Sequence, residues 1–245
     1  MRWAGAAAIA CCLAVMLAST CWAGGVNFAW NGCLPEGGVS SLSSQCSGNT
    51  GSIEAVGSFV VSQPRPAFVG NEIAIDIQAD ASALPDWWQY FNDRACRATA
   101  LSASFDFRGA PQTSCTDPFS GLAMGGLAAY QTAQTYPAVP SGAPNAARLV
   151  LGVAVATPSP LSAGVEYYCF RLRITMQRTT GGGACAGCTV PVCLTLNEIR
   201  AAENTGPVER LTNALQSSMI SWQEASGCQS AVKNRTWGQV KNLYR

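Results

Sequence analysis

Four cysteines in the last third of the chain have spacing that could support chemistry. Cys185 and Cys188 are two residues apart, and Cys193 and Cys228 follow. Four thiolates can hold a structural zinc ion in a tetrahedral cage, and a Cys-x-x-Cys pair at a helix start can do redox chemistry. However, Cys193 and Cys228 form no second close pair, and no βαβ pattern surrounds the motif. The spacing therefore predicts two disulfides within this set, in any of three pairings, with a zinc-stabilised domain as the alternative.

The aromatic segment from Asp86 to Tyr90 is the most typical of a ligand site. Its rings can stack on sugar rings, and the neighbouring carboxylate can bind hydroxyl groups or Ca²⁺. The candidate ligand-binding residues are therefore Asp86, Trp87, Trp88 and Tyr90. Because adjacent residues on a strand point to opposite faces, the alternative is that one tryptophan fills the core and the other packs under a loop.

Carboxylates offer a different chemistry. Asp76 or Asp86 with Glu166 or Glu198 would form the pair that a carbohydrate-active hydrolase needs, but no spacing selects one pair. The chain has no histidine, which excludes Ser-His and Cys-His dyads and histidine metal ligands. We therefore expect a protein without catalytic residues, cofactor or metal, and the hydrolase is the alternative.

Composition narrows the function classes further. Charged residues make up 12% of the 245 residues, against about 25% in typical domains, which argues against a disordered chain or a coiled coil. The net charge is +1, and removal of Arg2 with a leader would bring it to zero. A neutral chain has no basic footprint, so we do not expect it to bind nucleic acid.

Residues 1–23 have the pattern of a secretory signal peptide. Arg2 is followed by an apolar stretch from Ala4 to Leu17 and by small residues before a cleavage site after Ala23. A membrane anchor and a lipoprotein modified at Cys21 are the alternatives. No later apolar run approaches the roughly 18 residues of a membrane span. We therefore predict a secreted protein whose mature chain has no transmembrane segment.

Removal of the signal peptide would take away Cys11, Cys12 and Cys21 and leave nine of the twelve cysteines in the mature chain. In an exported protein, these nine are interpreted first as disulfide-bonded. Cys33–Cys46 and Cys96–Cys115 are predicted as local bridges. Because the number is odd, at least one cysteine is free or is bonded to another chain. Cys169 is the candidate, because it falls on the predicted polar face of a strand beside Arg171.

Alternation of apolar and polar residues with a period of two dominates the mature chain, as in antiparallel strands. Turn-forming Gly, Pro and Ser residues separate the runs, and short helices are expected near Pro85 and within residues 207–217. The Gly/Ala-rich connection at residues 117–126 is expected to be a covering loop with a short helix. We predict an all-β fold: residues 24–230 form a single two-layer antiparallel β-sandwich of about eight to nine strands, with long loops pinned by disulfides. The predicted strands lie at residues 26–30, 59–61, 72–80, 101–107, 149–155, 168–176, 192–196 and 220–222.

Several motifs together resemble a group of exported bacterial proteins to which no activity is assigned. They are Val26–Cys33, Leu84–Trp88, Ala184–Cys188 with Pro191–Asn197, and Thr236–Arg245. The resemblance covers nearly all of the mature chain and implies no catalytic residue. The general shape also resembles cohesin-like and carbohydrate-binding sandwiches, at the level of fold only.

These features favour a secreted, non-catalytic binding or structural module, whose partner is a polysaccharide or another envelope protein. The basic C-terminal tail, residues 231–245, is the second candidate site. Its Trp237, Val240 and Tyr244 would share one helix face. This face could dock on the envelope surface, and a fraying terminus is the alternative.

Overall fold

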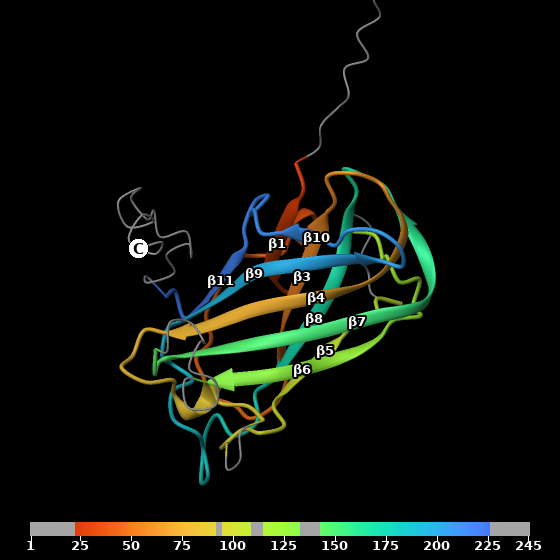
Figure 1. Cartoon of the computed structure of the whole chain (residues 1–245). Helices are drawn as coiled ribbons and strands as arrows, with labels where there is room; N and C mark the ends of the chain where they lie inside the picture. The colour runs from red at the N-terminus through yellow and green to blue at the C-terminus, as the bar shows by residue number, and fades with distance from the viewer. Residues whose placement is uncertain (1–22, 92–94, 109–114, 133–142, 226–245) are drawn as a thin grey trace, which may run out of the picture.

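The computed structural model describes residues 23–91, 95–108, 115–132 and 143–225. In this part of the chain, two β-sheets pack face to face, and helix is limited to two short 3₁₀ turns, η1 (Leu34–Glu36) and η2 (Asp86–Trp88) (Figure 1). The prediction of an all-β sandwich is therefore confirmed. No helix among these residues has the length and apolarity needed to cross a membrane.

The smaller sheet has four strands and the larger has seven. In the smaller sheet the order is β1 (Gly25–Trp30), β3 (Ser52–Val60), β8 (Glu166–Thr175) and β5 (Leu101–Ser104). In the larger sheet the order is β2 (Ser41–Leu42), β11 (Met219–Trp222), β9 (Val192–Glu203), β4 (Arg65–Ala79), β7 (Ala146–Leu161) and β6 (Met124–Thr132), and β10 (Glu209–Leu211) also pairs with β9. Neighbouring strands are antiparallel except β2 and β11.

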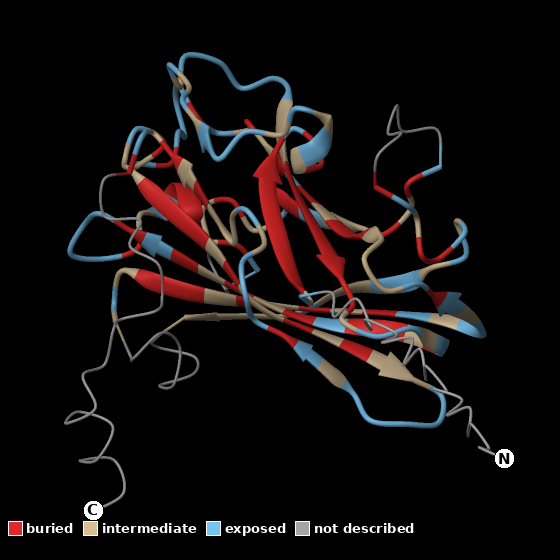
Figure 2. Ribbon diagram, turned by 90° about the horizontal axis from the view of Figure 1, so that it is seen from above, coloured by how far each residue is buried: buried red, intermediate tan, exposed pale blue. Residues whose placement is uncertain are grey.

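The alternating patterns place one side of each sheet in the core. On β4, Ile73, Ile75 and Ile77 are buried between the sheets, whereas Glu72 and Asp76 lie on the outward face. Figure 2 shows that the buried residues concentrate between the two layers. The core therefore follows the period of two that the sequence contains.

A β-bulge in β8 changes which side chains face the core. Gly57 of β3 pairs with Phe170 and Ser58 pairs with Tyr168, so Cys169 is the extra residue. Phe170 faces the core as predicted, but before the bulge the alternation reverses, and Cys169 is fully buried in the same core. The expectation that Cys169 lies on a polar face is therefore wrong.

Two other predictions about secondary structure also differ from the structure. Residues 207–217 contain strand β10 and no helix, and the Gly/Ala-rich connection near residue 124 leads into β6, which its composition concealed. By contrast, the helical turn expected at Pro85 is present as η2. Eleven strands are therefore found in the described residues, where about eight to nine were predicted.

The bulge yields a prediction about Gly57. A Cβ atom at this position would lie 2.2 Å from Cε1 of Phe170, so Gly57→Ala should lower the free energy of unfolding by about 1–3 kcal/mol through overpacking. Gly152→Ala is the control, because nothing lies within 4 Å of a Cβ atom there. Urea unfolding of both variants checks this, and equal stabilities would contradict the tight contact.

Candidate functional site

The disulfides join distant segments of the chain rather than neighbouring cysteines. Cys33 bonds to Cys115, Cys46 to Cys188, and Cys96 to Cys185. The predicted local bridges Cys33–Cys46 and Cys96–Cys115 are therefore wrong. Sequence spacing favoured short loops, whereas the fold brings together residues that are 82 to 142 positions apart.

The Cys185-Ala-Gly-Cys188 motif bonds in two directions. Because Cys185 and Cys188 are bonded to Cys96 and Cys46, they pair neither with each other nor with Cys193. The predicted pair of disulfides within the set of four, and the alternative zinc cage, are both wrong for this reason. Cys193 is also disulfide-bonded, and Cys228 lies outside the described residues.

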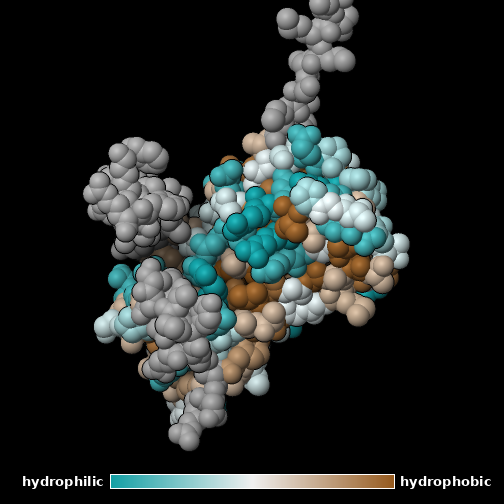
Figure 3. Space-filling view, in the orientation of Figure 1, coloured by the Kyte–Doolittle hydropathy of each residue, from teal (hydrophilic) through white to brown (hydrophobic). Residues whose placement is uncertain are grey.

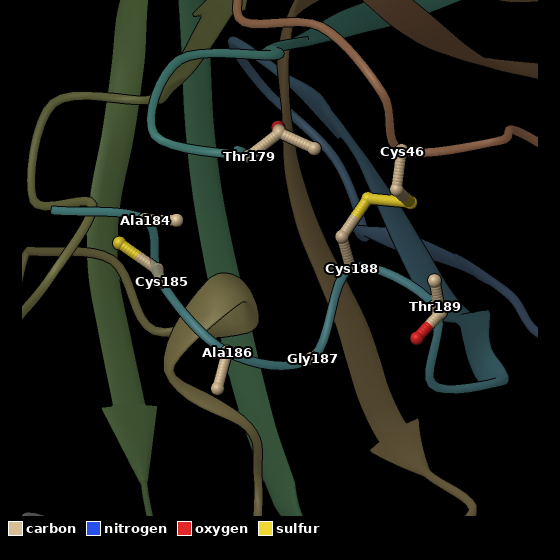
Figure 4. A pocket seen from close by; sticks show the side chains of 8 residues that line it. All are labelled: Cys46, Thr179, Ala184, Cys185, Ala186, Gly187, Cys188 and Thr189. Carbon is tan, nitrogen blue, oxygen red and sulfur yellow. A yellow bond between two sulfur atoms is a disulfide. The ribbon is translucent and has the colours of Figure 1, made fainter. Parts of the chain in front are cut away.

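A shallow hollow of about 310 Å³ lies over this motif (Figure 4). Its lining is uncharged and consists of Cys46, Thr179, Ala184, Cys185, Ala186, Gly187, Cys188 and Thr189. With no charged group or aromatic ring at its surface, the hollow has little to recognise a ligand with. The loop acts instead as a cover for the residues beneath it, the aromatic cluster.

The aromatic cluster consists of Trp30, Trp87, Trp88 and Trp222, with Tyr90 beside Trp88. Trp87 stacks on Trp222 with ring centroids 5.7 Å apart, and Trp88 meets both edge-on. The covering loop bonds directly to this cluster: Trp222 Nε1 donates to the Cys188 carbonyl at 2.6 Å, and the Trp87 amide donates to the Ala186 carbonyl at 2.9 Å. The cluster is therefore closed at this end of the sandwich.

The prediction that Trp87, Trp88 and Tyr90 form a surface for stacking on sugars is contradicted by their burial. All three side chains have no exposed surface. Asp86, the remaining member of that set, is exposed at the start of η2. Both tryptophans fill the core, which the sequence could not decide, because η2 is a 3₁₀ turn rather than a strand with opposite faces.

Arg97 lies inside the cluster with 1% of its surface exposed. Its guanidinium carbon is 3.5 Å from the centre of the Trp87 ring, and its N–H groups donate to the carbonyl oxygens of Trp87, Thr175 and Gln177. Burial lowers the pKa of Arg97, and the charged form is held by these carbonyl dipoles and by the aromatic face. Arg97 thus ties η2 to the end of β8.

A buried polar pair sits between the two sheets. Asn71 Nδ2 of β4 donates to Cys169 Sγ of β8 at 3.3 Å. Cys169 is the free cysteine of the described residues, and burial raises the pKa of its thiol. A neutral, enclosed thiol is unreactive, so its position does not suggest catalysis or exchange.

A polar cluster lies on the outward side of the smaller sheet, around Glu166. Its Oε1 accepts hydrogen bonds from Asn27 Nδ2 at 2.7 Å and Ser58 Oγ at 2.5 Å. The sulfur atoms of Cys33 and Cys115 lie within 4.8 Å of this carboxylate, but they are bonded to each other and offer no thiolate to a metal. The cluster joins β1, β3 and β8.

The structure separates most of the candidate catalytic carboxylates. Asp76 and Glu198 share the outward face of the larger sheet, Glu166 belongs to the smaller sheet, and Asp86 is in η2. Asp76 pairs with Arg148 at 2.7 Å. Hydrogen bonds from Arg210 and Arg200 lower the pKa of Glu198. A general acid requires a raised pKa, so this pair does not favour the hydrolase.

A second hollow, of about 350 Å³, lies on the outward face of the larger sheet. It is lined by Glu72, Arg200, Ala202, Val208 and Arg210. Arg200 contacts Glu72 at 3.2 Å and Glu198 at 3.1 Å, and Arg210 also pairs with Glu198. Val208, 50% exposed, stands among these charges. No motif in the sequence marks this site, because its residues come from β4, β9, the β9–β10 connection and β10.

No family model matches the chain, and no curated protein is similar to it. The resemblance to a group of exported bacterial proteins therefore stays a prediction. The tail residues Trp237, Val240 and Tyr244 and the predicted signal peptide, except for Ala23, lie outside the described residues.

Arg97 provides a test of the closed end, the end of the sandwich where the covering loop shields the aromatic cluster from solvent. Arg97→Met should lower the free energy of unfolding by about 3–5 kcal/mol, because one buried and two partly buried carbonyl groups lose their donors. Arg173→Met is the control: Arg173 is exposed on β8 and donates to Ser52 Oγ, so its loss should change stability by at most about 0.5 kcal/mol. Chemical unfolding measures both, and a small effect at Arg97 would contradict its role.

The buried thiol gives a second test. A thiol reagent should not react with the folded, unreduced protein, and about one thiol should react after unfolding in guanidinium chloride. Because the folded pKa of Cys169 is raised, its contribution to stability is complete below about pH 8.5 and declines as the pH rises further. Cys169→Ala should remove the reactive thiol. Three or more reactive thiols would contradict the disulfide assignment.

Proposed function

We propose that the chain is a non-catalytic β-sandwich module that works outside the cytoplasm and binds another envelope protein through the outward face of its seven-stranded sheet. The observation that carries this proposal is the hollow formed by Glu72, Arg200, Ala202, Val208 and Arg210. It combines an exposed apolar side chain with a surrounding set of ion pairs. Protein interfaces have this composition, with an apolar centre and a polar rim.

Apart from the Asp76–Arg148 ion pair, several side chains on the rest of this face are small. Ala74, Ala129, Val150 and Gly152 are partly exposed and small. In Figure 3, hydrophilic surface over β9 and β10 adjoins hydrophobic surface below it. A smooth surface of small side chains can approach a flat partner closely, so this face suits a protein surface.

The same face offers little to a polysaccharide. Binding by stacking requires an exposed aromatic ring, and the only aromatic residue of β4, β7 and β9 is Phe68, which is fully buried. Tyr130 of β6 packs against the core and donates to the Trp88 carbonyl. We therefore favour the protein partner over the carbohydrate.

The disulfides support the proposed location outside the cytoplasm. The three disulfides of the described residues are consistent with an extracytoplasmic protein, since such bonds persist in oxidising compartments. The proposed signal peptide would be removed after Ala23, and β1 begins two residues later, at Gly25. Cleavage there would leave every described strand intact.

Site-specific photo-crosslinking in cells that naturally make the chain tests the proposal. A photoreactive residue replacing Val208 should give a crosslinked product that a protease degrades, whereas one replacing Ser102, which is exposed on β5 of the other sheet, should not. Arg210→Glu should reduce the yield several-fold, because it places a third carboxylate beside Glu198 and Glu72. Arg173→Glu, on the smaller sheet, should not.

Two results would contradict the proposal. One is equal crosslinking from positions 102 and 208, or none from position 208. The other is a product that resists proteases and is shortened by glycan-cleaving enzymes. The mass of the purified chain should also correspond to an N-terminus at Gly24.

A further inference from the structure

The edges of the two sheets are treated very differently. A sheet edge presents unpaired N–H and C=O groups that can pair with another strand. The β1 edge is covered by the chain itself, because the amides of Val26 and Phe28 donate to the carbonyls of Asn213 and Ser217 at 2.8 and 2.7 Å. The edge strands β2 and β5 have only two and four residues. Three edges are therefore either covered or short.

The fourth edge, β6, is long, and within the described residues no further strand pairs with it. It is nine residues long, contains no charged residue and no proline, and lies at the rim of the larger sheet (Figure 1). Among the strands that the structure describes, β7 alone pairs with it. Leu122 and Met124, at its start, are 68% and 74% exposed. Proteins usually protect a strand of this length and composition.

We propose that β6 pairs in antiparallel fashion with β6 of a second copy of this chain, about a two-fold axis. The two seven-stranded sheets then form one continuous sheet. Because the same strand serves both copies, the contact is satisfied in both at once and association stops at a dimer. The backbone edge of β6 from Met124 to Gln131 gains a strand to pair with, and the exposed Met124 gains a neighbouring strand.

The composition of β6 favours β6 of a second copy of this chain as the strand that pairs with its edge. Antiparallel self-pairing about a two-fold axis brings the side chains nearest the axis close to their own copies, so a charge there would meet a like charge; β6 has no charged residue. The formal charge of the chain, +1, or zero without Arg2, also opposes association little. The outward side chains Gly126 and Ala129 are small, and a second strand can approach them closely.

One feature of β6 limits the pairing without preventing it. The register with β7 shifts between Leu127 and Ala129, which makes Ala128 a bulged residue. A bulge increases local twist, so the two strands would cross with more twist than flat ladders do. Ala128 itself is small and exposed, which leaves room for the second copy.

This inference goes beyond the proposed function and does not depend on it. The hollow at Val208 lies over β4, β9, the β9–β10 connection and β10, away from β6 in the strand order. A dimer built through β6 would carry two such hollows on one continuous face. It would therefore present two copies of the proposed binding site to a partner.

Sedimentation of the mature chain over a range of about 1 to 100 µM tests the pairing. The wild-type chain should shift from monomer to dimer, and Ala129→Lys should weaken the dimer about tenfold or more, because two lysines would meet near the two-fold axis. Ala74→Lys adds the same charge to the same face at the centre of the sheet and should leave the dimer unchanged. Amide hydrogens of residues 124–131 should exchange more slowly at high than at low concentration.

The other outcomes overturn the proposal. A chain that stays monomeric to about 100 µM has no β6 dimer. Equal weakening by both lysine variants would indicate face-to-face packing, and oligomers beyond the dimer would show that the edge is not closed by two-fold pairing. Crosslinking from position 208 does not use β6, so failure of the dimer and failure of the proposed function are separate results.

Discussion

A charged guanidinium and four tryptophan side chains share one end of the sandwich, and the rest of the structure depends on keeping that end dry. Arg97 is 1% exposed, and Trp30, Trp87, Trp88 and Trp222 are fully buried. Burying a charge is costly unless its hydrogen bonds are replaced. Backbone carbonyls of η2 and of the residues around the end of β8 accept these hydrogen bonds instead. The loop of residues 185–188 covers the tryptophans and excludes solvent from them.

The same constraint explains why a short Cys-x-x-Cys motif forms no disulfide of its own. Cys185 holds the segment that carries Arg97, through Cys96, and Cys188 holds the segment before β3, through Cys46. Each bridge closes a long stretch of chain, 89 and 142 residues in separation, which restricts the unfolded chain strongly. This end thus provides stability, and the exposed face and edge of the larger sheet remain for the proposed interactions.

The sequence predicted the layers well, because alternation such as that of Ile73, Ile75 and Ile77 follows directly from strand geometry. It failed where tertiary contacts decide. The disulfide between Cys46 and Cys188 depends on which loops meet at one end of the sandwich. A β-bulge in β8 buries Cys169, although the alternation of apolar and polar residues predicts that it faces solvent. The aromatic residues suggested a surface site, but only the folded end shows that Arg97 and Trp222 enclose them. The hollow around Val208 has no motif, so only the structure could reveal it.

Peptide mapping of the unreduced protein tests the central claim most directly. Proteolysis between the cysteines, with free thiols blocked beforehand, followed by mass spectrometry identifies each linked pair. The closed end requires separate links from Cys185 to Cys96 and from Cys188 to Cys46. A link between Cys185 and Cys188 themselves would leave the loop unattached on both sides and would contradict this account of the fold.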